Sequence, residues 1–284
     1  MAAPKTKTPT KRRTSKKKAA TSTWKWHVLA YSVLIVGFLV FHYRDGIRYF
    51  VQDIYEYVFR NSEKKDVTVH DIRAIEILDK HDEHLFGFDV SHYQYEIEWK
   101  VIDSLYKKYP LDYVFVRSTM GVDGQDQQFK KNWKHAKTRL LVRGAYHYYR
   151  PDENSTLQAE NFILNTPLEP GDFVPVLDVE DYPKEQSVDK MVDGVRNWLH
   201  IVEAHYGVQP MIYSGENFYE LNLKEHFPNH KIWIAKYSLF SEKMKDEWHF
   251  WQFTDKGTVP GIETPVDLNI FKGNRQDLKE FLMQ

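Results

Sequence analysis

Carboxyl groups interrupt or close several apolar runs of this 284-residue chain. The clearest case is the segment Leu177–Asp181, in which Asp178 and Glu180 end a run of apolar residues. Residues two apart in a strand face the same side, so these two carboxyl groups are expected to point together. Acidic residues are depleted in strands, and two more, Asp89 and Asp267, lie in comparable segments.

Clustered carboxyl groups repel one another, which raises at least one pKa and leaves a proton available near neutral pH. Cleavage of a glycosidic bond uses such a proton on the leaving oxygen, together with negative charge near an oxocarbenium-like centre. The alternatives are a divalent-metal site, or pairing of these acids with basic residues such as Arg117 and Arg143. We predict no cofactor and no bound metal, and the predicted catalytic residues are Glu180, Asp178, Asp89 and Asp267.

Aromatic residues near the ends of the predicted strands would supply the second half of a sugar site. Flat rings stack on pyranose faces, and tyrosine hydroxyls bind sugar oxygens, although each ring could equally pack in a core. His92 and His147 lie in the same segments and are interpreted as structural hydrogen-bonding residues. The predicted substrate-binding residues are Tyr93, Tyr146, Tyr148, Tyr213, Trp233, Tyr237 and Trp251.

The elements that must position these residues alternate between strand and helix from residue 85 onward. Apolar strands are predicted at 86–91, 112–118, 140–148, 173–179 and 210–214. Helical patterns follow them, around 97–105, 127–137, 156–164 and 188–205, with a short helix after 210–214. This alternation predicts parallel strands joined by right-handed crossovers.

Three more strands follow at 231–236, 248–253 and 265–271, too close together for crossover helices. The eight strands together predict an α/β fold. We expect an irregular TIM-like (β/α) barrel with eight strands, whose last three strands lack regular crossover helices. A doubly wound open sheet is the alternative, but no glycine fingerprint follows the first strand. The ends of barrel strands meet at one mouth, where the four carboxyl groups would converge.

Several segments of the barrel domain resemble those of a known family. Residues 85–284 are similar to the glycoside hydrolase family 25 lysozymes, the N-acetylmuramidases also called Chalaropsis-type. The resemblance rests on segments in the family's order: Gly87-Phe-Asp-Val-Ser-His-Tyr-Gln94, Arg143-Gly-Ala-Tyr-His-Tyr-Tyr149, Pro175-Val-Leu-Asp-Val-Glu180, Ile212-Tyr-Ser214, Trp251-Gln-Phe253 and Val266-Asp-Leu-Asn-Ile-Phe271.

The resemblance implies the barrel fold and cleavage of the β-1,4 bond between N-acetylmuramic acid and N-acetylglucosamine in peptidoglycan. By position, Glu180 matches the family's general acid/base, and Tyr148 and Tyr213 match aromatic residues of its groove. The other acids of that groove are matched by Asp89, Asp178 and Asp267.

These observations predict a peptidoglycan hydrolase that acts by carboxylate acid/base catalysis. The Asp-x-Glu pair favours participation of the substrate's 2-acetamido group, while an aspartate nucleophile and an inverting water stay open. Two other functions also stay open: a non-catalytic membrane-tethered peptidoglycan-binding protein, and a glycosidase of another N-acetylated polysaccharide.

The first 84 residues differ from the rest in composition. Residues 1–25 carry nine Lys and Arg and no acids, so they are predicted to be a disordered cytoplasmic tail. Residues 26–43 are apolar with aromatic ends and are predicted to form a transmembrane helix. A cleaved signal peptide is the alternative, but no small-x-small site follows.

Residues 44–84 are predicted to be a spacer before the barrel domain at 85–284. The segment 47–59 fits a short amphipathic helix near the membrane surface. His81 and His84 bracket two acids, which we interpret as a solvated linker rather than a metal motif.

The basic tail predicts a single-pass protein with a cytoplasmic N-terminus and an extracytoplasmic catalytic domain. The expected partners are peptidoglycan glycan strands and, through residues 26–43, the membrane, with no nucleic acid.

The net charge of −1 combines +9 in residues 1–25 with 30 basic and 40 acidic residues in the remainder. The chain has no cysteine, which excludes disulfide scaffolds and thiolate chemistry.

Overall fold

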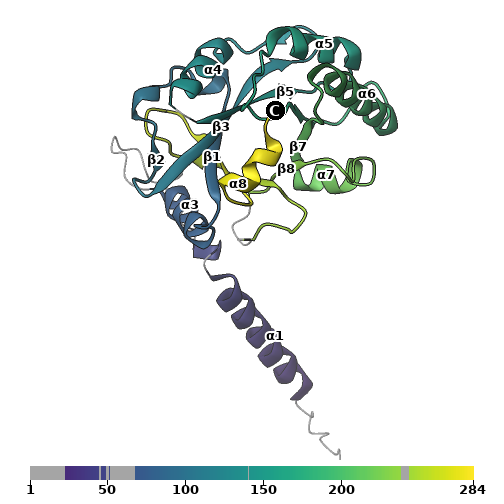
Figure 1. Cartoon of the computed structure of the whole chain (residues 1–284). Coiled ribbons are helices and arrows are strands. Elements are labelled where there is room, and N and C mark those ends of the chain that lie inside the picture. The colour runs from purple at the N-terminus through teal and green to yellow at the C-terminus, as the bar shows by residue number, and fades with distance from the viewer. Residues whose placement is uncertain (1–22, 45, 49–50, 52–67, 140, 238–242) are drawn as a thin grey trace, which may run out of the picture. The chain divides into compact units, whose positions relative to one another are not determined.

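The computed structural model describes the chain from residue 23 onward, apart from 45, 49–50, 52–67, 140 and 238–242 (Figure 1). The chain divides into two compact units, Met1–Ile47 and Arg48–Gln284. Nearly all of the predicted tail at 1–25 and most of the predicted amphipathic helix at 47–59 lie outside the described residues.

In the described part of the first unit, helix α1 spans Thr23–His42. It covers almost all of the segment at 26–43 that was predicted to cross a membrane. Within the residues that the structure describes, however, no helix is both long enough and apolar enough to span a bilayer. The structure therefore does not support the predicted transmembrane helix.

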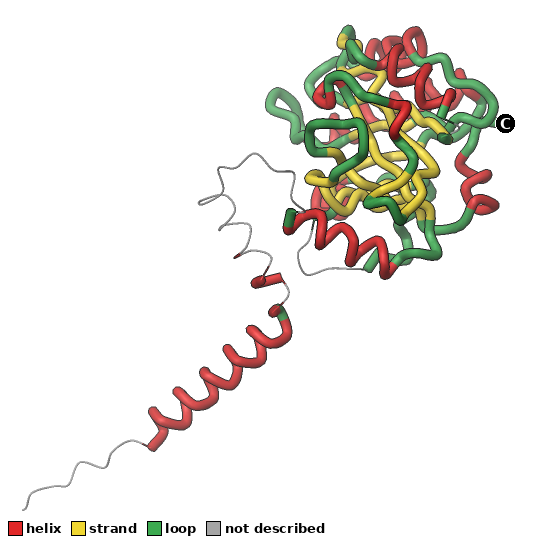
Figure 2. Tube along the Cα trace, turned by 90° about the vertical axis from the view of Figure 1, so that its left-hand side faces the viewer, coloured by secondary structure: helices red, strands yellow, loops and turns green. Residues whose placement is uncertain are grey.

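Eight strands of the second unit close into a barrel (Figures 1 and 2). Around the ring they are β1 (Leu85–Val90), β3 (Tyr109–Met120), β5 (Val142–Tyr148), β6 (Val176–Asp178), β7 (Met211–Gly215), β8 (Ile232–Ala235), β9 (Phe250–Gly257) and β10 (Val266–Phe271). Two short strands, β2 (Ser104–Leu105) and β4 (Gly124–Gln125), pair with β3. The predicted eight-stranded α/β barrel is confirmed, and the open-sheet alternative is wrong.

The direction of the last strand departs from a fully parallel barrel. Strands β1 to β9 pair in parallel around the ring, whereas β10 is antiparallel to both β9 and β1. No helix occurs between β9 and β10, and a short connection of this kind reverses the chain. The start of β10 therefore lies at the same mouth as the ends of the parallel strands.

Aromatic side chains fill the interior of the barrel. Phe115 stacks on Trp233 with ring centroids 4.5 Å apart and lies 4.7 Å from Phe173. Phe250 contacts Phe115 at 5.5 Å, and all four rings are buried. Burial of these rings is a main source of the barrel's stability.

Helices cover the outside of the barrel, as Figure 1 shows. They are α4 (Phe129–Thr138), α5 (Ser155–Asn165), α6 (Val188–Tyr206) and α7 (Glu216–Asn222), and a one-turn helix, α8 (Arg275–Leu278), follows β10. In α6, Met191, Val195 and Trp198 recur at helical spacing and are buried. Ser187 caps its start, and Gly207 ends it with a φ of 72°. These four crossover helices confirm the predicted ones.

The helix predicted at 97–105 is absent. A 3₁₀ turn at Trp99–Val101 and strand β2 occupy this segment, and another 3₁₀ turn, at His92–Gln94, precedes it. Tyr95, between the two turns, has a φ of 51°, which lies in the left-handed region and cannot continue a right-handed helix. The first crossover is therefore an irregular loop beside the barrel mouth.

Part of the predicted spacer belongs to the barrel unit. Helix α3 (Val69–Lys80) begins with a capping box at Thr68 and Asp71. Its Ile77 and Leu78 are 1% and 0% exposed and join the core outside the barrel strands. Residues 69–80, which were predicted to belong to the spacer, therefore pack on the barrel, whereas Asp82 and Glu83 in the turn that follows are exposed.

Candidate active site

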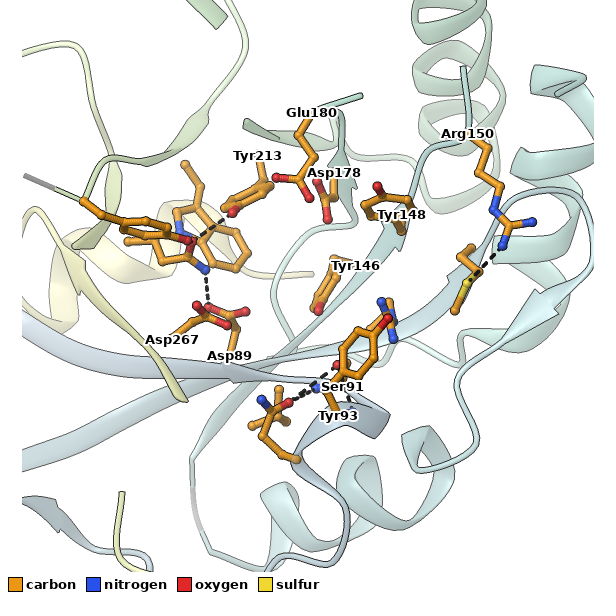
Figure 3. Close-up of a pocket in the computed structure, with 17 residues that line it drawn as sticks. Asp89, Ser91, Tyr93, Tyr146, Tyr148, Arg150, Asp178, Glu180, Tyr213 and Asp267 are labelled. Atoms are coloured by element: carbon orange, nitrogen blue, oxygen red, sulfur yellow. Dashed lines mark hydrogen bonds between the residues drawn. The ribbon is translucent and has the colours of Figure 1, made fainter. Parts of the chain in front are cut away.

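A cavity of about 480 Å³ opens at the barrel mouth, where the parallel strands end (Figure 3). All four predicted catalytic carboxyl groups line it, together with every predicted substrate-binding aromatic residue except Trp251. The structure thus brings together residues that lie as far apart in the sequence as Asp89 and Asp267.

Asp178 and Glu180 come from the end of β6. Asp178 is the last residue of the strand, and the chain beyond it stays extended because Val179 N–H donates to the Tyr213 carbonyl at 3.0 Å. Ser214 Oγ donates to the Val179 carbonyl at 2.6 Å. These bonds keep Glu180 on the same side as Asp178, and Figure 3 shows both carboxyl groups at the cavity.

Asp89 and Asp267 come from adjacent strands at the same mouth. Asp89 precedes the last residue of β1, and Asp267 is its direct partner in the antiparallel pairing with β10. Gln252 Nε2 and Asn269 Nδ2 donate to Asp89 Oδ2 at 2.7 and 2.8 Å. Asp89 is therefore fixed in position, whereas Asp267 is only half-buried.

Burial raises the pKa of each of these four carboxyl groups. The pKa of Asp89 rises to about 7, because burial and the charge of Glu180 outweigh the two amide donors. The pKa of Asp267 rises to about 9 through burial and the charges of Asp89 and Asp255. Burial, followed by the charges of Glu180 and Asp89, places the pKa of Asp178 well above its usual range.

Glu180 is the most accessible of the four acids. Its side chain is exposed to solvent, yet the surrounding walls desolvate the carboxyl group and, with the charge of Asp181, raise its pKa. A carboxyl group that is both reachable and easily protonated can donate a proton to a ligand in the cavity.

The alternative in which arginines neutralise these acids is wrong. Arg117 Nε contacts Asp126 Oδ2 at 3.2 Å, although its charge still lowers the pKa of Asp178. Arg143 forms a bidentate pair with Asp172 at 2.7 and 3.1 Å. Both guanidinium groups are thus held by other carboxylates.

The divalent-metal alternative is also not supported. In the described part of the chain, one group of three or more metal-ligating side chains brings its ligand atoms within 4.8 Å of one another, and it consists of His81, Glu83 and His84. The four acids of the cavity form no such group. One of them has spare bonding capacity: Asp178 Oδ1 is buried without a hydrogen-bond partner among the described residues.

Aromatic residues form the floor and rims of the cavity. Trp233 is 2% exposed and lies at the floor, while Tyr93 and Tyr237 are 63% and 50% exposed at the rims. Tyr213 and Tyr237 both donate hydroxyl hydrogen bonds to Gln252 Oε1, the former at 2.8 Å. Figure 3 shows Tyr146 and Tyr148 beside Asp178.

The prediction for Trp251 is wrong. This side chain is fully buried, does not line the cavity and packs against Trp248 and Phe253 on the outside of the barrel. Its neighbour Gln252 faces the cavity instead, as the alternation of side chains in a strand requires.

Several residues of the site were missed from the sequence. Gln252 and Asn269 hold Asp89, and Arg117 and Arg150 line the cavity. The sequence pattern could have identified Gln252 and Asn269 as site residues, because each is a polar residue within an apolar strand segment. Asn269 also lies two residues from Asp267, which places both side chains on the same face of the strand. No comparable pattern marks the arginines.

The two histidines have the structural roles that were expected. His147 is fully buried, contacts Thr119 Oγ1 at 2.7 Å and Gln158 Oε1 at 3.2 Å, and has its pKa lowered to about 4 by burial. His92 Nδ1 contacts Asp126 Oδ2 at 3.1 Å. Neither ring lines the cavity.

Comparison with known proteins assigns this arrangement to a family. The model of the glycosyl hydrolases family 25 matches residues 88–262. The protein YegX of Escherichia coli (strain K12) is 36% identical over 202 residues, which cover 70% of this chain and 73% of that protein. Lysozyme M1 of Streptomyces globisporus is 27% identical over 66% of this chain and 68% of its own length.

Solved structures share the fold. A family 25 glycosyl hydrolase from Bacillus anthracis is 31% identical, with a TM-score of 0.63 over 71% of this chain and 95% of that one. A bacterial lysozyme from Streptomyces coelicolor has the same TM-score of 0.63 at 24% identity, over 70% of this chain and 97% of that one.

Proposed function

The chain belongs to the glycosyl hydrolases family 25 and is therefore a glycoside hydrolase, and on that premise we propose that it is a muramidase. Its substrate would be peptidoglycan, cleaved at the β-1,4 bond between N-acetylmuramic acid and N-acetylglucosamine. The observation that carries this proposal is the convergence of four carboxyl groups with raised pKa values in one aromatic-walled cavity. The similarity to lysozyme M1 of Streptomyces globisporus and to an autolytic lysozyme of Clostridium acetobutylicum supports the substrate class.

Glu180 would act as the general acid. Its raised pKa lets the carboxyl group keep its proton to a higher pH than an ordinary glutamic acid would, and its exposure lets that proton reach a bound glycosidic oxygen. Proton transfer to this oxygen accompanies breakage of its bond to the anomeric carbon. The resulting carboxylate would then take a proton from the incoming water.

Asp178 would hold the 2-acetamido group. Its buried, unpartnered Oδ1 offers an acceptor for the acetamido N–H and would orient the acetamido carbonyl oxygen toward the anomeric carbon. Attack by that oxygen forms a cyclic oxazolinium ion, which water then opens with retained configuration. Asp89, held by Gln252 and Asn269, would stabilise the positive charge from the other side.

Mass spectrometry of muropeptides released from purified peptidoglycan tests both the activity and the bond. The expected products have N-acetylmuramic acid at their reducing ends, initially in the β configuration. Products that end in N-acetylglucosamine, or no released sugar at all, would overturn the muramidase proposal. An initial α anomer would leave the bond assignment intact but reject acetamido participation in favour of an inverting water.

A trapping experiment separates the acetamido route from an aspartate nucleophile. Quenched digests of the wild-type enzyme should contain no glycosyl–peptide adduct at Asp178 or Asp89, because the intermediate stays within the sugar. A covalent adduct on either residue would overturn acetamido participation. Because the substrate is cell-wall material, we also propose that the barrel domain works outside the cytoplasm.

A further inference from the structure

A second cluster of ligand-type side chains lies at the other end of β1. His81, Glu83 and His84 occupy the turn between α3 and β1, whereas Asp89 lies near the far end of that strand. The turn is compact, because His84 N–H donates to the His81 carbonyl at 3.0 Å. One ligand atom from each of the three side chains falls within 4.8 Å of the other two.

His81, Glu83 and His84 are held by ring packing as well as by an ion pair. The two imidazole rings lie 5.7 Å apart at an interplanar angle of 23°, and His84 Nε2 approaches Glu83 Oε1 at 3.7 Å. His81 is 9% exposed, and its ring packs edge-on against Trp251 at 5.8 Å. His84 Nδ1 is buried without a hydrogen-bond partner among the described residues, which is costly unless something binds it.

We propose that His81, Glu83 and His84 bind one Zn²⁺ ion, which ties the end of α3 to the start of β1. Two imidazole nitrogens and one carboxylate oxygen suit this borderline-soft cation, and a water molecule would complete a tetrahedron. Zinc–nitrogen bonds of about 2.0–2.1 Å place ligand atoms about 3.4 Å apart, so closing from separations of at most 4.8 Å needs an inward movement of no more than about 1 Å per atom. The ion is structural, because the catalytic carboxyl groups lie at the opposite end of the strand.

One nearby charge opposes a cation at this position. Lys272 acts electrostatically on His84, yet its ammonium group donates to the Asp246 carbonyl at 3.0 Å and to Asp246 Oδ1 at 3.2 Å. Asp246 thus offsets the charge of Lys272, while Glu83 supplies a negative charge to the ion. The balance of charge around the three ligands favours a divalent cation.

Calorimetric titration of the full-length, chelator-treated protein with ZnCl₂ tests the site. We expect one Zn²⁺ per chain and a rise in the unfolding midpoint on binding. Glu83→Gln, which keeps the shape of the side chain, and His84→Ala should each weaken this affinity by about tenfold or more. His205→Ala, which changes an exposed histidine of α6, should leave it unchanged.

Three results would overturn the site: no zinc binding by the wild-type protein, equal affinity in the Glu83→Gln and wild-type proteins, or equally tight binding of Mg²⁺. Neither the heat of binding nor the unfolding midpoint requires hydrolysis. The metal site can therefore fail while the muramidase proposal stands, and the reverse also holds.

Discussion

At the scale of single residues, the site separates a fixed acid from an accessible one. Asp89 is buried and accepts hydrogen bonds from two amides, so it is placed to meet positive charge rather than to move a proton. Glu180 is exposed and accepts no side-chain amide hydrogen bond from the described residues, which suits a group that must gain and lose a proton. Environment, rather than residue type, assigns the two roles.

Changing Glu180 to Gln removes the proposed proton donor while keeping the size of the side chain. We expect the lytic rate on purified peptidoglycan to fall by about 10²-fold or more, because general acid catalysis contributes about 10²–10⁴-fold. Turbidity loss of cell-wall suspensions measures this rate, and the unfolding midpoint serves as the folding control. A near-normal rate would reject Glu180 as the acid.

Gln252 is a positioning residue whose effect should be visible in the pH profile. Its amide lowers the pKa of Asp89, so Gln252→Met should raise that pKa. Loss of one hydrogen bond to the charged carboxylate should raise the pKa of Asp89 by about one unit. The acidic limb of the pH profile of kcat/KM should move to higher pH by the same amount. Tyr237→Phe, which removes a contact on the other end of Gln252, should leave the limb in place. A Gln252→Met profile lowered equally at every pH would indicate a purely structural role.

At the scale of elements, the strands could be predicted because each is an apolar run bounded by polar residues. The orientation of β10 could not, since it depends on the connection after β9 rather than on its own residues. Because successive side chains of a strand alternate between its two faces, Trp251 and Gln252 are predicted to face opposite sides. The alternation does not predict which of them faces the cavity. Helix α3 was missed because charged residues are interspersed among its apolar ones, and contact with the barrel reveals its buried face.

The packing of β5 against β3 allows no side chain at Gly144. A Cβ at this position would lie 2.3 Å from the ring of Phe115, which is itself stacked on Trp233 at 4.5 Å. Gly144→Ala should therefore lower the free energy of unfolding by about 1–3 kcal/mol through overpacking. Denaturant titration of the two proteins measures the difference.

Gly215 provides the matched control for that substitution. It ends β7 and is the N-cap residue of α7, and a Cβ there would meet nothing within 4 Å. Gly215→Ser should leave the stability unchanged or raise it slightly, because serine is a good N-cap residue. Equal losses in both variants would show that the close approach of Phe115 is not what restricts residue 144.

At the scale of the barrel unit, the acidic cavity is a cost to folding that function explains. Several carboxyl groups have pKa values raised by burial, so the folded protein holds protons that the unfolded chain would release. The contribution of these groups to stability is therefore greatest where they are protonated and declines as pH rises. A site built for stability alone would not gather four acids with raised pKa values in one cavity.

Asp267 allows this coupling between charge and stability to be measured. Its folded pKa of about 9 exceeds the ordinary value of 3.8, so its contribution to stability is full below pH 3.8 and is lost as pH rises through about 9. The unfolding midpoint of the wild-type protein should fall between pH 5 and about pH 9, and Asp267→Asn should make that fall shallower. The variant should thus gain most stability over the wild type at the alkaline end of this range.

Asp123→Asn, at an exposed turn, is the control, and its curve of unfolding midpoint against pH should run parallel to that of the wild type. If the Asp267→Asn curve also runs parallel to the wild type, the buried proton on Asp267 does not exist, and the charge of the cavity must be reassigned among the other three acids.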